Sequence, residues 1–446
     1  MGISLKKMTQ NIVWLIFDRS FILFLQFVVG IKIANYYGAD LYGKYSYAIS
    51  LVAFSEIFFE LINPRVVKKF YTEDNYNNIV YNTSFFRNIM AFLLFFVPII
   101  LKLFFTIDNL LLYMLLLICF DNILNSTTFG IENFFEYKLE SKRIVVSNNI
   151  VKTISYILQY ICMILHMGIL TVPVVRCFGS IVRVFILKYQ YKVSYIKKQK
   201  TIKKFDRNLI LKIINESKFL WMTFVSFLVY TQLDKIMIKY YLGEKEVGIY
   251  AIGIQLSSIL AILIGPIQNS TYSKMLELYK KDYKEYYNFF LLSNTVITQI
   301  YLFLTFMSII VVKYLFRHVY KSEYNPAIII YSILAFSVFI KAVGLLQTSH
   351  LTIKGLTQKS FYKTLAGLIL NVTLNSLLIP KYGINGAALA TLMTQFFVLI
   401  FLDFFIKEYR EHAFVQLKSF NTFYLLKMLK DIRVKNEIRN NKKNIF

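Results

Sequence analysis

Long apolar runs separated by short polar segments extend along nearly the whole chain, and this pattern predicts a protein that crosses a membrane many times. A membrane-spanning helix needs about 20 mostly apolar residues. Twelve runs have this length, at about 11–34, 43–62, 83–103, 109–129, 146–166, 170–190, 214–238, 247–270, 288–312, 326–350, 361–380 and 385–406. The first is expected to be a span rather than a cleaved signal peptide, because it is too long and is interrupted by Asp18 and Arg19. The sequence therefore predicts an all-α integral membrane protein with about 12 transmembrane helices.

Composition supports this prediction and excludes several other classes. Hydrophobic residues make up 57% of the 446 positions and charged residues only 17%, whereas soluble domains are about 25% charged. Disordered, collagen-like and disulfide-rich chains are excluded. Cys119, Cys162 and Cys177 lie in apolar runs and the four histidines are scattered, so neither a metal site nor a cofactor is expected.

The positions of the basic residues explain the net charge of +26. In a soluble protein such an excess would favour nucleic acid as a partner. If the N-terminus is cytoplasmic, however, Lys and Arg gather in the inside segments, notably 65–69, 138–143, 188–212 and the tail after 407, while the short outside loops hold few. The positive-inside rule therefore places both termini in the cytoplasm, and no nucleic acid is needed.

The longest internal loop divides the predicted spans into two groups of six. We expect an N-lobe at 1–190, a basic cytoplasmic linker at 191–213, a C-lobe at 214–406 and a basic cytoplasmic tail at 407–446. The tail mixes apolar residues with lysines. That pattern suits either a helix lying on the inner leaflet or a loosely ordered basic segment.

An internal repeat relates the two lobes. IANYYGADLYGKYSYAISL (33–51) and IMIKYYLGEKEVGIYAIGIQL (236–256) both contain a Tyr-Tyr pair followed by two spaced glycines. With one inserted residue, Gly38 and Gly43 align with Gly243 and Gly248. Each stretch joins the first and second spans of its lobe. A weaker sequence similarity relates residues 165–180 to residues 379–394. Since six is even, the lobes should share one orientation and enclose a cleft that opens alternately to each side.

Three segments resemble a known family: GIKIANYYGADLYGKYSYAISL (30–51), LDKIMIKYYLGEKEVGIYAIGIQL (233–256) and LIPKYGINGAALATL (378–392). They are similar to the polysaccharide-biosynthesis transporters of the MOP (multidrug/oligosaccharidyl-lipid/polysaccharide) superfamily, above all to O-antigen and capsule repeat-unit flippases of the Wzx type. The likeness covers essentially the whole chain in the number and order of spans.

This resemblance implies a MATE-like fold of two pseudo-symmetric six-helix lobes around an alternating-access cavity. It implies that a glycan linked to undecaprenyl pyrophosphate is moved from the inner to the outer leaflet of a bacterial cytoplasmic membrane. A polysaccharide polymerase and a chain-length regulator are then candidate partners, besides membrane lipids.

One motif is expected to be a decoy. The run from Gly38 to Lys44 fits the GxxxxGK pattern of a P-loop, but Tyr45 stands where Ser or Thr must bind Mg²⁺. It also lies between two spans without a preceding strand. We therefore expect a tight interhelical turn and no nucleotide.

Charged residues inside predicted spans are the candidate functional residues, because a charge near the bilayer centre costs at least ~2.5–3.5 kcal/mol unless it faces a cavity or a partner. Arg19 lies about 12 Å from the inner end of the first span. It either binds an anionic ligand or pairs with Asp18 or Glu56, and these two readings stay open. Glu60 follows Glu56 by one helical turn, and the three acids are candidates for ion coupling or salt bridges.

Span 6 carries Arg176 and Arg183 on one face, with Gly179 and Ser180 between them. This polar stripe suits the wall of a wet cavity. Lys341 is the best cationic candidate of the second lobe. Because arginine recognises phosphate oxygens bidentately, we expect Arg19, Arg183 and Lys341, supported by Arg176, to bind the pyrophosphate of a lipid-linked sugar.

Other residues in the spans are expected to serve the fold. Arg87 and Asp121 lie at similar depths, which predicts a structural pair. Pro98 and the Gly265-Pro266 dipeptide should kink their helices and are hinge candidates. Asp234 and Lys235 are expected to form a gate or a fold contact.

Three other functions compete with a flippase. An ion-coupled multidrug exporter of the same superfamily could use Asp18, but the neighbouring cations would repel a cationic drug. A membrane glycan polymerase needs a catalytic loop, and the outside loops are short. The acids within 130–145 form no recognisable catalytic motif, so no enzymatic activity is expected. A purely structural role fits poorly with charges at mid-membrane depth.

Overall fold

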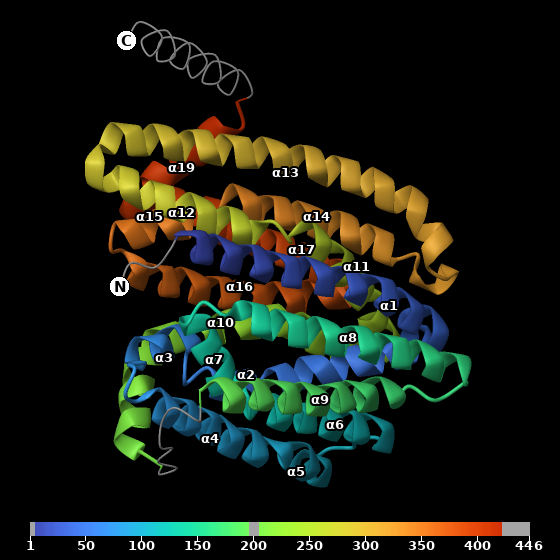
Figure 1. Cartoon of the computed structure of the whole chain (residues 1–446). Coiled ribbons are helices and arrows are strands. Elements are labelled where there is room, and N and C mark those ends of the chain that lie inside the picture. Colours follow the sequence, from blue (N-terminus) through green and yellow to red (C-terminus); the bar gives the residue numbers. More distant parts are fainter. Residues whose placement is uncertain (1–4, 196–204, 422–446) are drawn as a thin grey trace, which may run out of the picture. The chain divides into compact units, whose positions relative to one another are not determined.

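The structure is a computed structural model that describes residues 5–195 and 205–421 (Figure 1). The lysines of the linker between 197 and 204, and the tail beyond 421, lie outside the described residues. Within the described part every regular element is a helix and no strand occurs. This agrees with the predicted all-α class.

Contacts divide the chain into two compact units, Met1–Ala251 (unit 1) and Ile252–Phe446 (unit 2). The boundary lies inside one helix, α11 (Glu244–Leu260), and not in the predicted linker. The reason is that α10 (Arg207–Leu242) packs along α1 (Leu5–Ala53). The division into six-span lobes and the cleft between them stay predictions.

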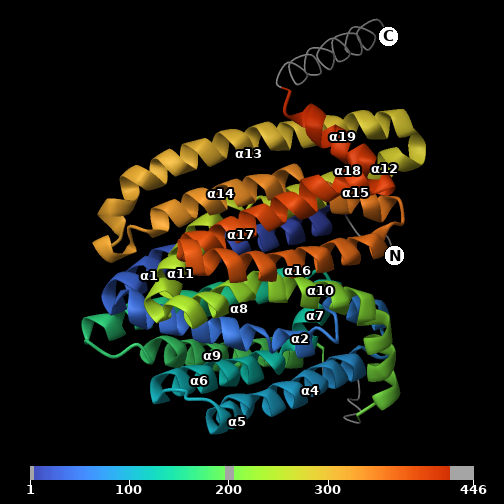
Figure 2. The ribbon, with the colours of Figure 1, turned by 180° about the vertical axis from the view of Figure 1, so that it is seen from behind.

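Unit 1 is built mainly of long helices that run alongside one another, most closely α8 with α9 and α1 with α8 (Figures 1 and 2). Besides α1, α10 and the start of α11, its helices are α2 (Glu56–Phe59), α3 (Pro64–Phe70), α4 (Tyr76–Phe95), α5 (Val97–Phe104), α6 (Asn109–Ser126), α7 (Phe129–Tyr137), α8 (Ser141–Ile164) and α9 (Thr171–Ser194).

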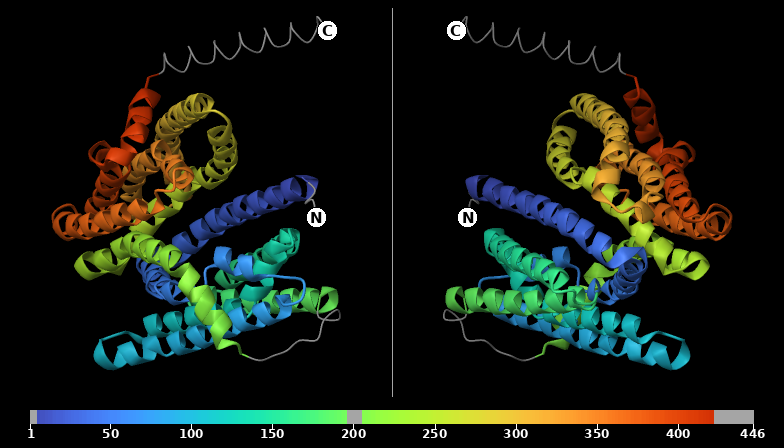
Figure 3. Two further views of the ribbon diagram at one scale, coloured as in Figure 1. Left: turned by 90° about the vertical axis from the view of Figure 1, so that its left-hand side faces the viewer. Right: turned by 90° about the vertical axis from the view of Figure 1, so that its right-hand side faces the viewer.

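Unit 2 is built in the same way, with α13 against α14 and α17 between α14 and α16 (Figure 2; Figure 3 gives two further views). After the end of α11, its helices are α12 (Ile264–Lys281), α13 (Tyr283–Val319), α14 (Ala327–Val343), α15 (Gln347–Ile353), α16 (Thr357–Tyr382), α17 (Ile384–Phe396), a π-helical turn η3 (Phe397–Phe401), α18 (Leu402–Phe405) and α19 (Arg410–Ser419).

The helices coincide with the apolar runs of the sequence. Each of the twelve predicted spans overlaps one helix or a run of two or three consecutive helical elements. Among the described residues, eight stretches are long and apolar enough to cross a membrane by length and composition alone. The chain is therefore a multi-pass membrane protein, and the count of twelve stays a prediction.

The repeat predicted from sequence is visible in the backbone. Gly38 has φ 78° and ψ 169°, and its aligned partner Gly243 has φ 98° and ψ −177°. Both angles lie in a region that side chains other than glycine rarely adopt. The predicted interhelical turn is thus confirmed at Gly38, where two helices meet within α1, and it recurs at Gly243.

The helices break just before the predicted kinks. α4 ends at Phe95 and α5 begins at Val97, which places Pro98 in the first turn of the new helix. Likewise α11 ends at Leu260 and α12 begins at Ile264, directly before Gly265-Pro266. Proline is tolerated in a first helical turn because the missing N–H has no intrahelical partner there. The kinks are confirmed, and their role as hinges stays a prediction.

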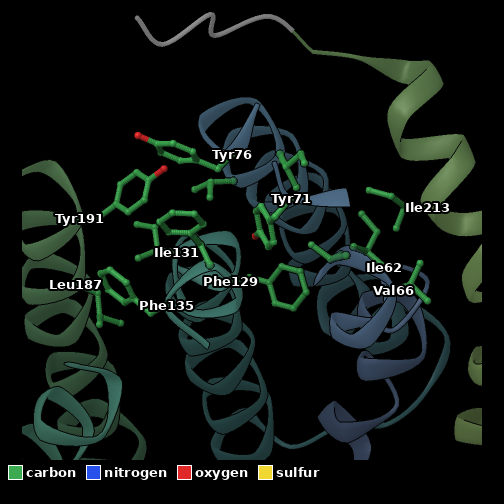
Figure 4. Packing of buried hydrophobic residues seen from close by; sticks show 14 of the residues in the cluster. Ile62, Val66, Tyr71, Tyr76, Phe129, Ile131, Phe135, Leu187, Tyr191 and Ile213 are labelled. Carbon is green, nitrogen blue, oxygen red and sulfur yellow. The ribbon is translucent and has the colours of Figure 1, made fainter. Parts of the chain in front are cut away.

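An aromatic core fixes α7 in unit 1 (Figure 4). The rings of Tyr76 and Phe134 stack at 4.7 Å between centroids, and Phe134 and Phe135 are fully buried. The Tyr71 hydroxyl donates to the carbonyl of Gly130 at 3.0 Å. A Cβ on Gly130 would lie 2.4 Å from the carbonyl oxygen of Val80. Only glycine therefore lets α7 approach α4 this closely, and the start of α7 is held firmly in place.

The described part of the tail belongs to the body of unit 2. Ala413 and Val415 of α19 are fully buried, and α19 packs against α13. Gln416 donates to the carbonyl of Leu399 at 2.8 Å. Residues 410–419 are thus a packed helix of the unit.

Candidate functional site

Three other helices of unit 1 supply partners to Arg183, which lies near the middle of α9. Its Nε donates to Oδ1 of Asn148 on α8 at 2.6 Å, and Nη1 donates to Oδ1 of Asn125 on α6 at 2.9 Å. Its Nη2 lies 2.7 Å from Oε2 of Glu132 on α7. The Arg183 side chain is 15% exposed and that of Glu132 is 25% exposed. Each nitrogen of the guanidinium therefore has a partner, and the group is held in one orientation.

A helix break positions Glu132. α6 ends at Ser126 and α7 begins at Phe129, where the sequence suggested only a loop rich in acids. The hydroxyl of Thr128, at the N-cap of α7, donates to Oε1 of Glu132 at 2.7 Å. The carboxylate is thus held between one hydroxyl and one guanidinium. The sequence reasoning missed Glu132, because neither its helix nor its partner is local.

Arg176 and Asp121 form a second ion pair, and this corrects one prediction. Nε of Arg176 lies 2.7 Å from Oδ2 of Asp121, and Ser180 donates to Oδ1 of the same carboxylate. Asp121 is 1% exposed, whereas the Arg176 side chain is 42% exposed. The predicted pairing of Asp121 with Arg87 is wrong, because Arg176 and Ser180 lie one helical turn apart and together occupy the Asp121 carboxylate.

Arg87 rests instead on aromatic rings. Its Cζ lies 3.9 Å from the ring centroid of Phe129 and 5.0 Å from that of Phe59, which is a cation–π arrangement. Its Nε is buried and has no hydrogen-bond partner among the described residues. The carboxylates whose charges act on it are Glu60, Glu132 and Glu56. Arg87 is thus a cation of unit 1 with unused donor capacity.

The other predicted site residues lie on or next to α1, α2 and α14. Asp18 and Arg19 lie on α1, but their side chains are outside the part of the chain whose side chains are described. Glu56 begins the short helix α2, and Glu60 at its end accepts a hydrogen bond from Asn63 at 2.6 Å. Lys341 lies in the last turn of α14, in unit 2. Their head-group and ion-coupling roles stay predictions.

The two copies of the repeat touch each other within unit 1. A Cβ at Gly43 would lie 1.8 Å from the carbonyl oxygen of Glu244, and one at Gly248 would lie 2.1 Å from that of Ala39. Lys44 bridges the same crossing because it lies 3.2 Å from Glu244, and it also pairs with Asp108 at the N-cap of α6. The crossing of α1 with α11 is therefore a backbone-to-backbone contact with ion pairs beside it.

Asp234 is part of the fold near this crossing. It is 4% exposed, and the hydroxyl of Tyr250 donates to its Oδ2 at 2.9 Å. Of the two predicted roles for Asp234, the fold contact is the one that this bond between α10 and α11 supports.

Unit 2 contains a buried ionic cluster that the sequence did not reveal. Asp403 on α18 accepts from Lys363 on α16 and from Gln347 on α15, and Nδ1 of His412 on α19 lies 2.8 Å from its Oδ2. Asp403 and His412 are 0% exposed and Lys363 is 4% exposed. The ring of Phe290 stacks on both His412 and His350. Two histidines that are distant in sequence therefore meet, although they form no metal site.

Among the described residues, no group of three or more His, Cys, Asp and Glu side chains is arranged to hold a metal ion.

Unit 2 also has an apolar groove of about 630 Å³ between α14, α16 and α17, with Phe339, Leu374 and Phe396 in its wall. The π-helical turn η3 contributes Phe401 to this wall.

Comparison with known proteins identifies the family and the fold. The model of the family described as "Polysaccharide biosynthesis protein" matches residues 8–278. Two uncharacterized membrane proteins of Methanocaldococcus jannaschii are 26% identical over 279 residues and 28% identical over 232 residues, which is 61% and 50% of this chain. The chain spans about half the length of these curated relatives, 50% and 52%.

Solved structures show the same fold. The lipid II flippase MurJ in an inward closed conformation has a TM-score of 0.66 at 16% identity, covering 94% of this chain and 95% of that one. An inward-facing multidrug resistance MATE family transporter of the MOP superfamily has a TM-score of 0.63 at 13% identity, covering 95% and 97%. These likenesses confirm the predicted MATE-like fold.

Proposed function

The chain belongs to the polysaccharide biosynthesis protein family, and on this premise we propose that it is a flippase for lipid-linked oligosaccharides. Its cargo is a polyprenyl diphosphate that carries an oligosaccharide, such as a repeat unit of O-antigen or capsule. The chain moves this cargo from the inner to the outer leaflet of the cytoplasmic membrane by alternating access. The observation that carries the proposal is Arg183, which residues of three other helices hold in one orientation near the middle of α9, a helix that the sequence predicts to be a span.

The chemistry of the cargo fits such an arginine. A diphosphate is strongly hydrated, and its transfer into hydrocarbon is costly unless fixed cations replace the lost water. A guanidinium offers two parallel N–H donors to phosphate oxygens. The polyprenyl tail stays in the lipid. In this proposal the head-group ligands are Arg19, Arg183 and Lys341, supported by Arg176.

Alternating access requires parts of the chain to move. We assign the hinges to the helix breaks at Pro98 and at Gly265-Pro266. The contact of Gly43 with Gly248 loosens when the opposite side of the cavity opens. Asp18, Glu56 and Glu60 are the candidates for ion coupling. No bond of the cargo is made or broken, so the proposed function is not enzymatic, and a polysaccharide polymerase and a chain-length regulator act after it.

The test is restoration of surface polysaccharide in cells that lack the chain. The unmodified chain restores it, and Arg183→Ala does not, although the protein reaches the membrane in normal amounts. Arg65→Ala removes the same charge from an exposed position and restores the polysaccharide. If Arg183→Ala restores the polysaccharide as well as Arg65→Ala does, Arg183 is not a cargo ligand.

A second candidate is an ion-coupled exporter of cationic small molecules, favoured by Glu56 and Glu60. Arg87 acts on both carboxylates electrostatically, but neither carboxylate forms an ion pair within 4 Å among the described side chains, which leaves them able to attract a cation. Cells that express the chain would then survive higher concentrations of cationic dyes. Unchanged dye resistance together with restored polysaccharide favours the flippase.

A further inference from the structure

Arg183 and Arg87 both meet α7 within one helical turn. Arg183 pairs with Glu132, and Arg87 lies on the ring of Phe129. Positions three apart on a helix are neighbours on its surface. The charge of Glu132 also acts on Arg87. Glu132 therefore pairs directly with Arg183, and its charge reaches Arg87, whose guanidinium lies on Phe129 one turn earlier on α7.

The partners of Arg183 leave its charge available to an anion. Asn125 and Asn148 accept through neutral amide oxygens, which orient the guanidinium without neutralising it. Glu132 is the charged partner within 4 Å among the described side chains. If Glu132 moved away, a preoriented arginine would remain, together with Arg87 and its unused Nε.

The depth of the site explains why such a carboxylate is needed. Arg183 is twelve residues from the start of the 24-residue helix α9, which is about 18 Å at 1.5 Å per residue. In a helix that spans the membrane, as the sequence predicts for 170–190, an unpaired arginine at this position is costly. A flippase must nevertheless return with its site empty, so an internal anion that covers the arginine lowers the cost of that state.

We propose that Glu132 is a built-in competitor for the cargo's diphosphate: it occupies the anion site of Arg183 and Arg87 when the chain is empty, and the diphosphate displaces it. This rests on the proposed function and adds a regulating residue to it. The competitor sets the affinity, because each binding event must break the Glu132–Arg183 pair and each release restores it. Glu132 is suited to move, since it is 25% exposed and Thr128 is its other hydrogen-bond partner.

The test is binding of farnesyl diphosphate to the full chain in detergent, measured by titration calorimetry. Glu132→Gln keeps an oxygen for Arg183 and Thr128 but removes the competing charge, so the Kd should fall about tenfold, which corresponds to about 1.4 kcal/mol. Glu136→Gln is the matched control. Glu136 lies one turn further along α7 and pairs with Lys68 at 2.5 Å, so its loss should leave the Kd unchanged. Arg183→Ala and Arg87→Ala should each weaken binding.

A purely structural role of Glu132 predicts an unchanged or raised Kd in Glu132→Gln, and that result overturns the inference. Should Glu132→Gln fail to fold, Glu132→Asp provides the second variant. Its carboxylate is one methylene shorter and holds Arg183 less well, so the Kd should also fall, and an unchanged value would refute competition.

Failure of the inference can be told apart from failure of the proposed function. If the unmodified chain binds farnesyl diphosphate more tightly than farnesyl monophosphate, but Glu132→Gln binds no better, only the competitor role is wrong. If neither protein prefers the diphosphate, a diphosphate cargo is wrong as well, and both proposals fall.

Discussion

The buried ion pair of Asp403 and Lys363 should contribute strongly to the stability of unit 2. Their side chains are 0% and 4% exposed, and Gln347 and His412 also donate to the Asp403 carboxylate. Through these contacts Asp403 joins α18 to α15, α16 and α19. Asp403→Ala leaves the Lys363 ammonium buried without its charged partner. Removing one member of such a pair costs about 3–5 kcal/mol.

A double variant distinguishes the effect of the ion pair on stability from the effect of lost packing. Lys363→Met alone leaves the Asp403 carboxylate buried with only His412 and Gln347, and should also cost about 3–5 kcal/mol. If the two losses were independent, they would add to about 6–10 kcal/mol. We expect the combination of Asp403→Ala with Lys363→Met to cost no more than either single change, because it leaves no isolated charge. The coupling energy is then at least about 3 kcal/mol.

The assay is unfolding of the detergent-purified chain by increasing mole fractions of dodecyl sulfate, followed by far-ultraviolet circular dichroism. Four proteins are compared: the unmodified chain, the two single variants and the double variant. The reasoning is refuted if Asp403→Ala unfolds at the same mole fraction of dodecyl sulfate as the unmodified chain. It is also refuted if the losses of stability in the two single variants simply add in the double variant.

Two further perturbations test the contacts of Gly248 on α11 and of Lys44 on α1. Gly248→Ala places a Cβ 2.1 Å from the carbonyl oxygen of Ala39 and should cost about 1–3 kcal/mol of folding stability through overpacking. Gly168→Ala is the control, because a Cβ there has no neighbour within 4 Å. Equal stability of the two variants would contradict the close contact. The second perturbation is acid. Burial by itself raises the pKa of Asp108, but hydrogen bonds from Lys44 and from the Leu111 N–H outweigh it and hold the pKa below its usual value. The pair therefore stabilises the fold above the unfolded carboxyl pKa of about 3.9, and this contribution is lost as the pH falls through the lower folded value. Melting curves below pH 4 should show a smaller acid loss in Asp108→Asn, and an equal loss would remove Asp108 from the account.

The helices could be predicted from the sequence because their signals are local. Apolar runs of membrane-spanning length mark the long helices, and the glycine turn at Gly38 recurs at Gly243 because both positions need a positive φ. Pro98 likewise predicts the helix break between α4 and α5. These features depend on a few neighbouring residues.

The pairing of charges could not be predicted, because it depends on which helix faces are neighbours. Arg87 was matched to Asp121 by depth alone, whereas α9 brings Arg176 to that carboxylate. Glu132 was overlooked because a segment that read as a loop is a helix fixed by buried aromatic residues. The Asp403 cluster joins residues from four helices, and no spacing in the sequence signals it.

The central claim is that the chain moves a diphosphate-linked glycan across a bilayer, and transport in reconstituted liposomes tests it most directly. A polyprenyl diphosphate oligosaccharide with a fluorescent sugar is incorporated, and dithionite, which stays outside, bleaches the outer leaflet. In liposomes with the chain, the protected fraction should fall with time well below that of protein-free liposomes, and Arg183→Ala should resemble the protein-free sample. Equal protection with and without the chain would contradict the account.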